Sequence, residues 1–146
     1  MLNTADSMIG HKNAKYLEFG WASARLDDLA NWPAARLSAL FIAAGAWPAK
    51  GRASARLAVG TALRDAGLHR SPNSGWPEAA MAGALGIGLA GPRIYGGQRV
   101  DEPMMNASGR TTATPADMDL ALHIFSAACA VLSVTALVLA LCSTVF

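Results

Sequence analysis

The stretch IFSAACAVLSVTALVLALCSTVF, residues 124–146, decides the fold class because none of its 23 residues is charged. A helix of this length rises about 1.5 Å per residue and extends for about 34 Å, enough to cross a hydrocarbon core of about 30 Å. Eleven of its residues are Leu, Ile, Val or Phe, which favour insertion at the bilayer centre. The stretch predicts a C-terminal transmembrane helix, with a buried core helix as the alternative.

The whole chain is more apolar than an ordinary soluble domain. It is 53% hydrophobic and 15% charged, whereas soluble domains carry roughly 25% charged residues. The net charge is +2 and the basic residues are scattered, so no nucleic-acid partner is expected. Cys129 and Cys142 both lie in the C-terminal apolar stretch. We expect two buried thiols that point to opposite sides of a helix and do not pair with each other.

The rest of the sequence predicts a mainly α fold without strands. The expected protein is a helical integral membrane protein. Four segments are expected: a polar motif block at 1–35, a short apolar helix at 36–49, a polar region of helices and loops at 50–119, and the transmembrane helix at 120–146. The short apolar helix cannot span a bilayer alone. Interfacial, re-entrant and short-spanning placements therefore stay open for it.

Proline and glycine residues set the expected helix ends within the polar regions. A helix over 22–31 is expected to end before Pro33, and an amphipathic helix is expected over 53–68. Pro77 is expected at the first position of the next helix, with Gly91 and the proline after it as its stop.

The residues before the apolar stretch predict how the last helix begins. Residues 103–114 are expected to form an exposed loop. Thr114 is a favourable N-cap and Pro115 a favourable first helical residue, so we expect the helix to start there.

Five polar blocks occur in order along the chain. They are NTADSMIGHKN at 3–13, ARLDDL at 24–29, SPNSGWPEAAMAGALG at 71–86, YGG at 95–97 and TPAD at 114–117. Together they resemble the sequence blocks of the CobD/CbiB family of cobalamin-biosynthesis proteins. The resemblance extends over nearly the whole chain apart from the final apolar helix.

The resemblance implies an enzyme of cobalamin (vitamin B12) biosynthesis. Family members are multi-pass proteins of the cell (inner) membrane that join adenosylcobyric acid, a corrinoid, to aminopropanol or its phosphate. The product is adenosylcobinamide or its phosphate, and ATP is consumed. An adenosylcobinamide-phosphate synthase-like amide ligase that uses ATP and Mg²⁺ is therefore expected.

Family members are longer than this chain, which resembles only their C-terminal half. An N-terminal half, or other membrane proteins of cobalamin assembly, are the implied partners. The alternative is a truncated, catalytically inactive fragment or a non-catalytic membrane interaction subunit.

Two adjacent carboxylates are the expected metal ligands and catalytic residues. An ATP-dependent amide ligase needs Mg²⁺, which takes one or two carboxylates together with phosphate oxygens, and Asp27 and Asp28 could supply them. Neighbouring side chains diverge by about 100° on a helix, which argues against a joint grip on one ion. Arg25 is a candidate substrate-binding residue, and a simple Arg25–Asp28 pair is the structural alternative.

The opening block supplies further candidates for substrate binding. Asn3, Asp6, Ser7, Lys12 and Asn13 place acceptors, amides and a cation close together, and a lysine can hold a phosphate as a point charge. The alternative is a solvated polar N-terminus.

The turn before the 77–90 region supplies the last candidates. Free N–H groups at a helix N-terminus favour an anion, so Asn73 and Trp76 are expected to bind substrate and Glu78 to act in catalysis. The alternatives are core packing for Trp76 and helix stabilisation for Glu78.

Overall fold

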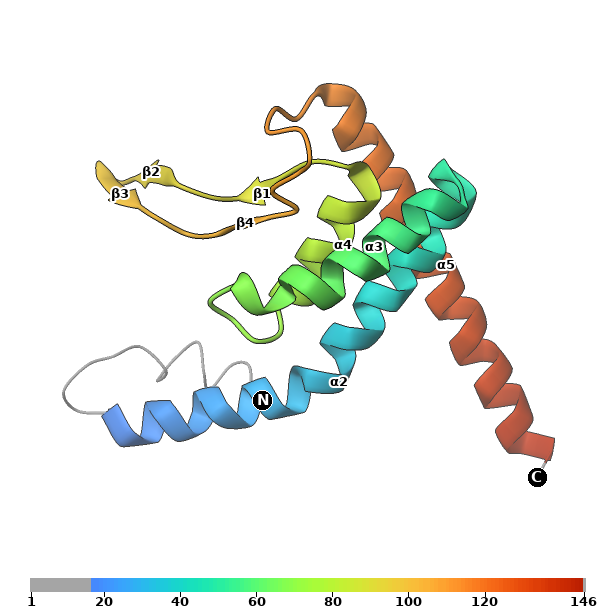
Figure 1. Cartoon of the computed structure of the whole chain (residues 1–146). Coiled ribbons are helices and arrows are strands. Elements are labelled where there is room, and N and C mark those ends of the chain that lie inside the picture. The colour runs from blue at the N-terminus through green and yellow to red at the C-terminus, as the bar shows by residue number, and fades with distance from the viewer. Residues whose placement is uncertain (1–16, 146) are drawn as a thin grey trace.

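The computed structural model describes residues 17–145. Its elements are α2 (Leu17–Lys50), α3 (Arg52–Asp65), the 3-10 turn η1 (Ala66–Leu68), α4 (Gly75–Leu85), β1 (Leu89–Ala90), β2 (Arg93–Tyr95), β3 (Gln98–Val100), β4 (Met104–Met105) and α5 (Pro115–Val145) (Figure 1). The mainly α prediction is confirmed. The amphipathic helix predicted over 53–68 corresponds closely to α3 followed by η1.

Pro33 does not end the first helix. α2 continues through Pro33 to Lys50, so the predicted end before Pro33 and the separate helix at 36–49 are both wrong. A proline inside a helix removes one hydrogen bond and kinks the axis, and Figure 1 shows α2 bending between its two halves. Ala35 and Ile42, beyond the proline, are buried, so tertiary packing keeps that part helical.

The core is built mainly from alanine. Its members are Ala39, Ile42, Ala43, Ala46, Ala58, Ala62, Ala80, Ala84, Leu85, Ile87 and Ile124. Such small side chains let helix backbones approach closely. Two glycines mark the closest approaches: Gly83 of α4 leaves no room for a Cβ against the Leu57 carbonyl oxygen of α3, and a Cβ on Gly45 of α2 would lie 2.5 Å from the Ile124 carbonyl oxygen of α5.

Two short antiparallel sheets follow α4, contrary to the prediction of no strands. Leu89 of β1 pairs with Met105 of β4, and β2 pairs with β3 in the same way. Strands of two or three residues are too short to show the alternation that reveals a strand in sequence. The predicted helix stop at Gly91 is also wrong, because α4 ends at Gly86, whose φ of 74° is left-handed and typical of a helix C-terminus.

The predicted exposed loop at 103–114 is partly buried. Met105 and Asn106 are buried because the Asn106 amide donates hydrogen bonds to the carbonyl oxygens of Ala82 (3.2 Å) and Ile87 (3.1 Å). The last carbonyls of a helix have no partner within it. Asn106 therefore anchors this loop to the end of α4.

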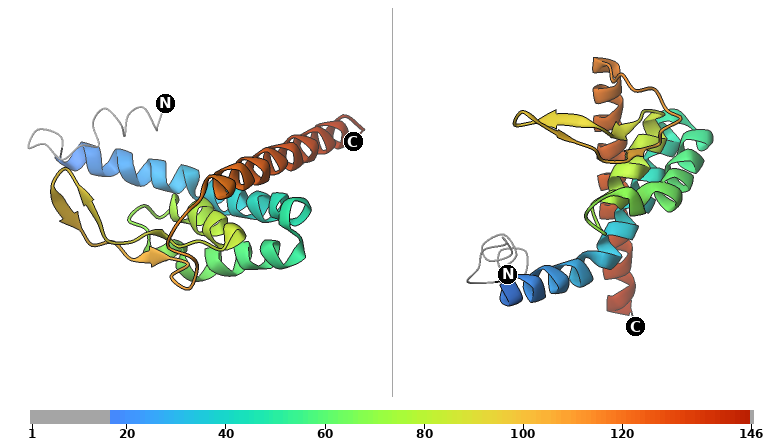
Figure 2. Two further views of the ribbon diagram at one scale, coloured as in Figure 1. Left: turned by 90° about the horizontal axis from the view of Figure 1, so that it is seen from above. Right: turned by 60° about the vertical axis from the view of Figure 1, so that its left-hand side comes forward.

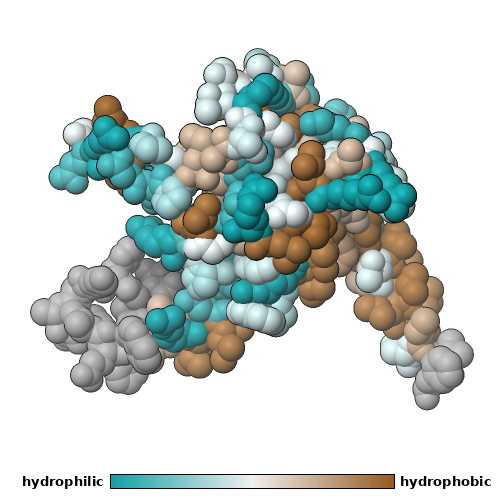
Figure 3. Space-filling model, viewed as in Figure 1, coloured by the Kyte–Doolittle hydropathy of each residue, from teal (hydrophilic) through white to brown (hydrophobic). Residues whose placement is uncertain are grey.

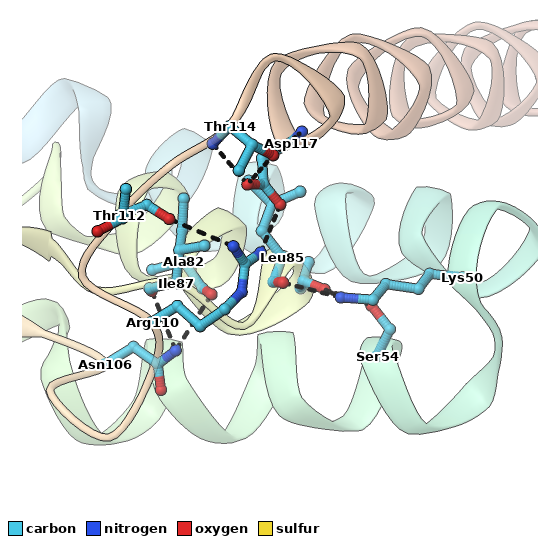
Figure 4. A network of polar contacts seen from close by, with 11 residues as sticks. Lys50, Ser54, Ala82, Leu85, Ile87, Asn106, Arg110, Thr112, Thr114 and Asp117 are labelled. Carbon is cyan, nitrogen blue, oxygen red and sulfur yellow. Dashed lines mark hydrogen bonds and ion pairs between the residues drawn. The ribbon is translucent and has the colours of Figure 1, made fainter.

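Two side chains from α2 and α3 bond to the same end of α4 (Figure 4). Lys50 Nζ donates to the Leu85 carbonyl oxygen at 2.8 Å, and Ser54 Oγ donates to the Ala84 carbonyl oxygen at 2.8 Å. A cation at this position also complements the helix dipole. These contacts fix the direction of α4, and so the position of the turn at its other end.

Asp65 connects α3 to the 103–114 loop through a contact that we expect to be sensitive to acid. Its carboxylate accepts the Asn106 N–H at 2.7 Å. The hydrogen bond from Arg64 lowers the Asp65 pKa most, burial opposes it, and the Asn106 N–H lowers it further. A carboxyl with a lowered folded pKa stabilises the fold above its unfolded pKa of about 3.9, and this contribution is lost as pH falls through the folded value.

We therefore expect Asp65→Asn to lower the unfolding free energy at pH 7 by roughly 1 to 3 kcal/mol and to flatten its decline below about pH 4. Thermal melts in detergent at several pH values measure both. The exposed Asp101 provides the matched control, Asp101→Asn. A melting profile of Asp65→Asn that follows the wild type down to acid pH would contradict the role of Asp65.

α5 begins as predicted. Thr114 accepts the Asp117 N–H through its hydroxyl (3.4 Å), and the Thr114 N–H donates to the Asp117 carboxylate (2.8 Å), a reciprocal N-cap. Pro115 is the first helical residue. Arg110 holds the same carboxylate at 2.6 Å and ties the loop to the helix.

Most of α5 is exposed in the described chain, although part of it packs on α2. In the part of the chain that the structure describes, α5 is the one helix long and apolar enough to cross a membrane, with a mean hydropathy of 2.5 and 11% of that stretch buried. Figures 2 and 3 show its C-terminal end projecting from the other helices with a mostly hydrophobic surface. Cys129 and Cys142 are exposed on it, so the prediction of buried thiols is wrong.

Candidate functional site

The structure brings two of the polar sequence blocks together at Asn73. The Asn73 amide donates to the Asp28 carbonyl oxygen at 2.8 Å, and its Oδ1 accepts a hydrogen bond from Arg36 at 3.2 Å. These partners lie 45 and 37 positions away in the sequence. One side chain thus ties the turn before α4 to the N-terminal half of α2.

Arg36 lies between two indole rings. Its guanidinium carbon is 3.9 Å from the centroid of Trp32 and 4.8 Å from that of Trp76, within the range of cation–π attraction. The same Arg36 nitrogen that bonds Asn73 also donates to the Trp32 carbonyl oxygen at 2.8 Å. Arg36 and Trp32 were not among the predicted site residues, because nothing in the local sequence signals a contact with a turn some 40 positions on.

The Trp76 side chain contacts both the hydrophobic core and the Arg36 guanidinium. The side chain is partly buried and packs against the hydrophobic core, which confirms the alternative of core packing. The Trp76 ring also faces the Arg36 guanidinium, so the predicted role of Trp76 in substrate binding stays a prediction.

The turn is shaped by its own polar groups. Ser71 Oγ accepts the N–H groups of Asn73 (3.4 Å) and Ser74 (3.3 Å), a local bond that favours turns. α4 begins at Gly75, so Pro77 is its third residue and not its first. A Cβ at Gly75 would meet the Ala66 carbonyl oxygen, which explains the need for glycine.

Glu78 lies in the first turn of α4, next to His69. Its Oε2 is 3.5 Å from His69 Nε2, and the side chains are 35% and 26% exposed respectively. The Ser71 N–H donates to the other ring nitrogen of His69 at 2.8 Å. The pair can therefore accept, hold or pass on a proton at a partly solvated position.

Glu78 also borders an apolar groove of about 650 Å³ between α2, α4 and α5. Its other walls are mainly hydrophobic, formed by Ala34, Leu37, Ser38, Phe41, Ile42, Pro77, Met81, Leu89, Phe125, Ala128, Cys129 and Leu132. The Glu78 carboxylate thus lies between a polar turn and an apolar surface.

Asp27 and Asp28 lie on α2, beside the Asn73 contact. Both are partly buried, and neither carboxylate forms an ion pair within residues 17–145.

The carboxylates of Asp27 and Asp28 fit a Mg²⁺ ion that is shared with a substrate phosphate. Nowhere in residues 17–145 do three His, Cys, Asp or Glu side chains gather as a ready metal site. Mg²⁺ often uses only one or two carboxylates plus substrate phosphates. Both aspartates lie on α2, where neighbouring side chains diverge by about 100°, so one of them at a time suits an ion that a phosphorylated substrate also holds.

The candidates of the opening block lie outside the described residues. Asn3, Asp6, Ser7, Lys12 and Asn13 precede Leu17, where the description begins, so their roles stay predictions.

Sequence comparison places the chain among cobalamin-biosynthesis proteins. Residues 1–125 match the family described as CobD/Cbib protein. Three similar relatives are each named cobalamin biosynthesis protein CobD. The one from Rhizobium meliloti (strain 1021) is 69% identical over 91% of this chain and 41% of its own length. The one from Sinorhizobium fredii is 65% identical over 97% of this chain and 43% of its own length. The one from Rhodobacter capsulatus is 51% identical over 88% of this chain and 39% of its own length.

The chain thus spans about two fifths of the length of the curated relatives it matches. No solved structure matches it.

Proposed function

Since this chain belongs to the CobD/CbiB family, we propose that it takes part in cobalamin biosynthesis and carries part of the active site that makes an amide on a corrinoid. The reaction would join adenosylcobyric acid to aminopropanol or its phosphate, with ATP as the source of activation. A carboxylate is unreactive toward an amine at neutral pH. Its oxygen must first be phosphorylated or adenylated before the amine can displace it.

The observation that carries the proposal is the Asn73 bridge. It ties the main chain at Asp28 and the Arg36 side chain to the turn that leads to Glu78. Asp28 and the turn come from the two described blocks that carry the longest resemblance to the family, and Arg36 lies between these blocks in the sequence. A site for phosphate transfer and amide formation needs such a mixture of carboxylates and a cation.

The residues divide into distinct proposed roles. Asp27 or Asp28, whichever faces the substrate phosphates, would hold Mg²⁺, which neutralises phosphate charge when it is bound. Glu78, supported by His69 at 3.5 Å, would accept the proton that the attacking amine gives up. Arg25 and Asn73 would position the substrates, as would the opening-block residues.

We further propose that the protein works in the cell membrane. The length, hydropathy and exposure of α5 support this placement, because a soluble protein rarely exposes so continuous an apolar surface. The apolar groove beside Glu78 would then lie close to the hydrocarbon region and keep water away from an activated acyl group.

Product formation tests the proposed function directly. Membranes containing this chain would be given adenosylcobyric acid, aminopropanol phosphate and Mg-ATP, and the product identified by mass. A second preparation would add the part of the Rhizobium meliloti relative that the chain does not match. Product above an empty-vector control in either preparation supports the proposal, and product only in the second means a shared site. Product in neither overturns it and favours the non-catalytic alternative.

Asn73→Ala is expected to slow product formation by about 10-fold, because misplaced catalytic groups lose much of their effect. It should also lower the unfolding free energy by about 1 to 2 kcal/mol, since the Asp28 carbonyl loses its partner. Initial rates and thermal melts measure the two effects.

Asn31→Ala is the matched control for Asn73→Ala. Among residues 17–145, the Asn31 amide donates only to the Asp27 carbonyl oxygen one turn earlier in the same helix, at 3.0 Å. We expect it to keep nearly the full rate. Equal rates for the two variants would show that the bridge to the turn has no part in the reaction.

A further inference from the structure

Two arginines of α3 have no partner in the described part of the chain. Arg52 and Arg56 lie one helical turn apart, and both are exposed. Among residues 17–145, neither guanidinium forms an ion pair or a hydrogen bond, whereas Arg64 of the same helix pairs with Asp65. Residues four positions apart share one face of a helix, so Arg52 and Arg56 form one basic edge.

This basic edge borders an open groove between α2 and α3. The groove has a volume of about 590 Å³, and none of the residues that line it is acidic. Its walls include Leu40, Ala44 and Trp47 of α2 and Arg52, Arg56 and Val59 of α3. Leu40 and Trp47 are 55% and 61% exposed. The groove therefore joins two cations to an exposed apolar wall.

The groove lies beside the point where the apolar stretch of α5 begins. Gly45 of α2 packs against the backbone of Ile124 and Ala128, and Ile124 is the first residue of the uncharged stretch 124–146. Trp47 follows Gly45 by two residues. Figures 1 and 2 show α3 crossing beside the first half of α5, while the other end of α5 projects away. With α5 in a bilayer, the groove lies near the membrane surface, where tryptophan is enriched.

We propose that this groove binds an anionic phospholipid, with the headgroup phosphate at Arg52 and Arg56 and an acyl chain along Leu40 and Trp47. A guanidinium suits phosphate oxygens, and basic pockets beside membrane helices attract anionic headgroups. A soluble phosphate would leave the apolar wall without a partner, and a zwitterionic lipid has no net charge to offset the two arginines. The proposal rests on the membrane placement of α5 in the proposed function, but not on the amide-forming reaction.

Native mass spectrometry of the purified full chain, released from a nonionic detergent, tests the proposal. Phosphatidylglycerol and phosphatidylcholine with the same acyl chains are added in separate titrations. We expect the chain to retain one phosphatidylglycerol at concentrations where it retains no phosphatidylcholine. Arg52→Ala/Arg56→Ala should weaken the apparent affinity for phosphatidylglycerol by about 30-fold, at about 5-fold for each basic residue near a membrane surface.

Two control variants separate charge from shape. Arg93→Ala/Arg99→Ala removes the same charge from the hairpin, where both arginines pair with acids, and it should retain the lipid as the wild type does. Gly60 lines the groove, and nothing lies within 4 Å of a Cβ built on it. Gly60→Leu should therefore fill part of the groove and weaken lipid retention although both arginines remain. Far-ultraviolet circular dichroism checks that each variant keeps its helices.

The fluorescence of Trp47 locates the lipid. The chain is placed in phosphatidylcholine vesicles that contain a small fraction of phosphatidylglycerol with brominated acyl chains, because bromine quenches nearby tryptophan. We expect stronger quenching than with the same fraction of brominated phosphatidylcholine. Trp47→Phe keeps the apolar wall and should remove this excess quenching, as should Arg52→Ala/Arg56→Ala.

The outcomes separate the lipid site from its alternatives. Equal retention of the two lipids, or equal weakening by the hairpin variant, would overturn the site. A dimer of the chain that Gly60→Leu dissociates would make the groove a protein interface and would also overturn it. Absence of quenching by either brominated lipid would contradict the membrane placement together with the site. Lipid binding is measured without turnover, so selective retention by a chain that forms no product overturns only the proposed reaction.

Discussion

Glu78→Gln is expected to form the amide product at least about 100-fold more slowly than the wild type. A general base contributes roughly 10²- to 10⁴-fold to a rate, and a glutamine amide cannot accept the amine proton. The substitution keeps the size of the side chain, so the groove beside it should stay intact. Rates of product formation, measured in whichever membrane preparation forms product, check the expectation.

The control for Glu78→Gln is the same substitution at Glu102. That carboxylate pairs with Arg93 at 2.8 Å on the projecting hairpin, outside the proposed site, and Glu102→Gln should leave the rate unchanged. Removing Glu78 from the first turn of α4 should cost about 0.3 to 1 kcal/mol of stability through the helix dipole. A rate for Glu78→Gln close to that of the wild type would remove Glu78 from the mechanism.

Gly45→Leu is expected to lower the unfolding free energy by about 3 kcal/mol, the upper part of the range for overpacked cores. A Cβ at Gly45 would lie 2.5 Å from the Ile124 carbonyl oxygen and 2.7 Å from the Ala128 backbone nitrogen. Both atoms belong to the backbone of α5, so no side-chain rotation can relieve the contact. α2 and α5 would have to move apart at their main point of contact.

Gly60→Leu is the matched control for Gly45→Leu. Gly60 lies in the middle of α3, and nothing lies within 4 Å of a Cβ built there. Replacing a helical glycine by leucine should raise stability by up to about 1 kcal/mol. SDS titration of the chain in mixed micelles compares the two. If both variants unfold at the same SDS fraction, α5 does not pack on Gly45.

The sequence predicted helix in both halves of α2, but not that they form one continuous helix. Pro33 is a local signal for a helix end, and it led to the prediction that the helix stops before it. The residues beyond it, such as Ala35 and Ile42, are buried against other helices, and this burial outweighs the lost hydrogen bond. Local propensity is a weak guide where tertiary packing opposes it.

The candidate site was found in part. Asn73 was selected from a turn next to a helix start, and Asp28 from its carboxylate, both by local reasoning. That Asn73 contacts Asp28 and Arg36 could not be predicted, because hydrogen bonds across 37 and 45 positions leave no periodic pattern. For the same reason the Arg36 stack on Trp32 and Trp76 was missed.

Sequence alone determined the features that depend on short stretches of the chain. These are the mainly α class, the apolar C-terminal helix, its start at Thr114 and Pro115, and the resemblance to the family. Helix length, capping and composition are set by neighbouring residues, so a single sequence contains them. Only the tertiary structure decided that α2 continues through Pro33, that short strands follow α4, and that Arg36 meets the turn at Asn73. Each of these depends on burial or pairing between distant segments, which the chain acquires only when it is folded.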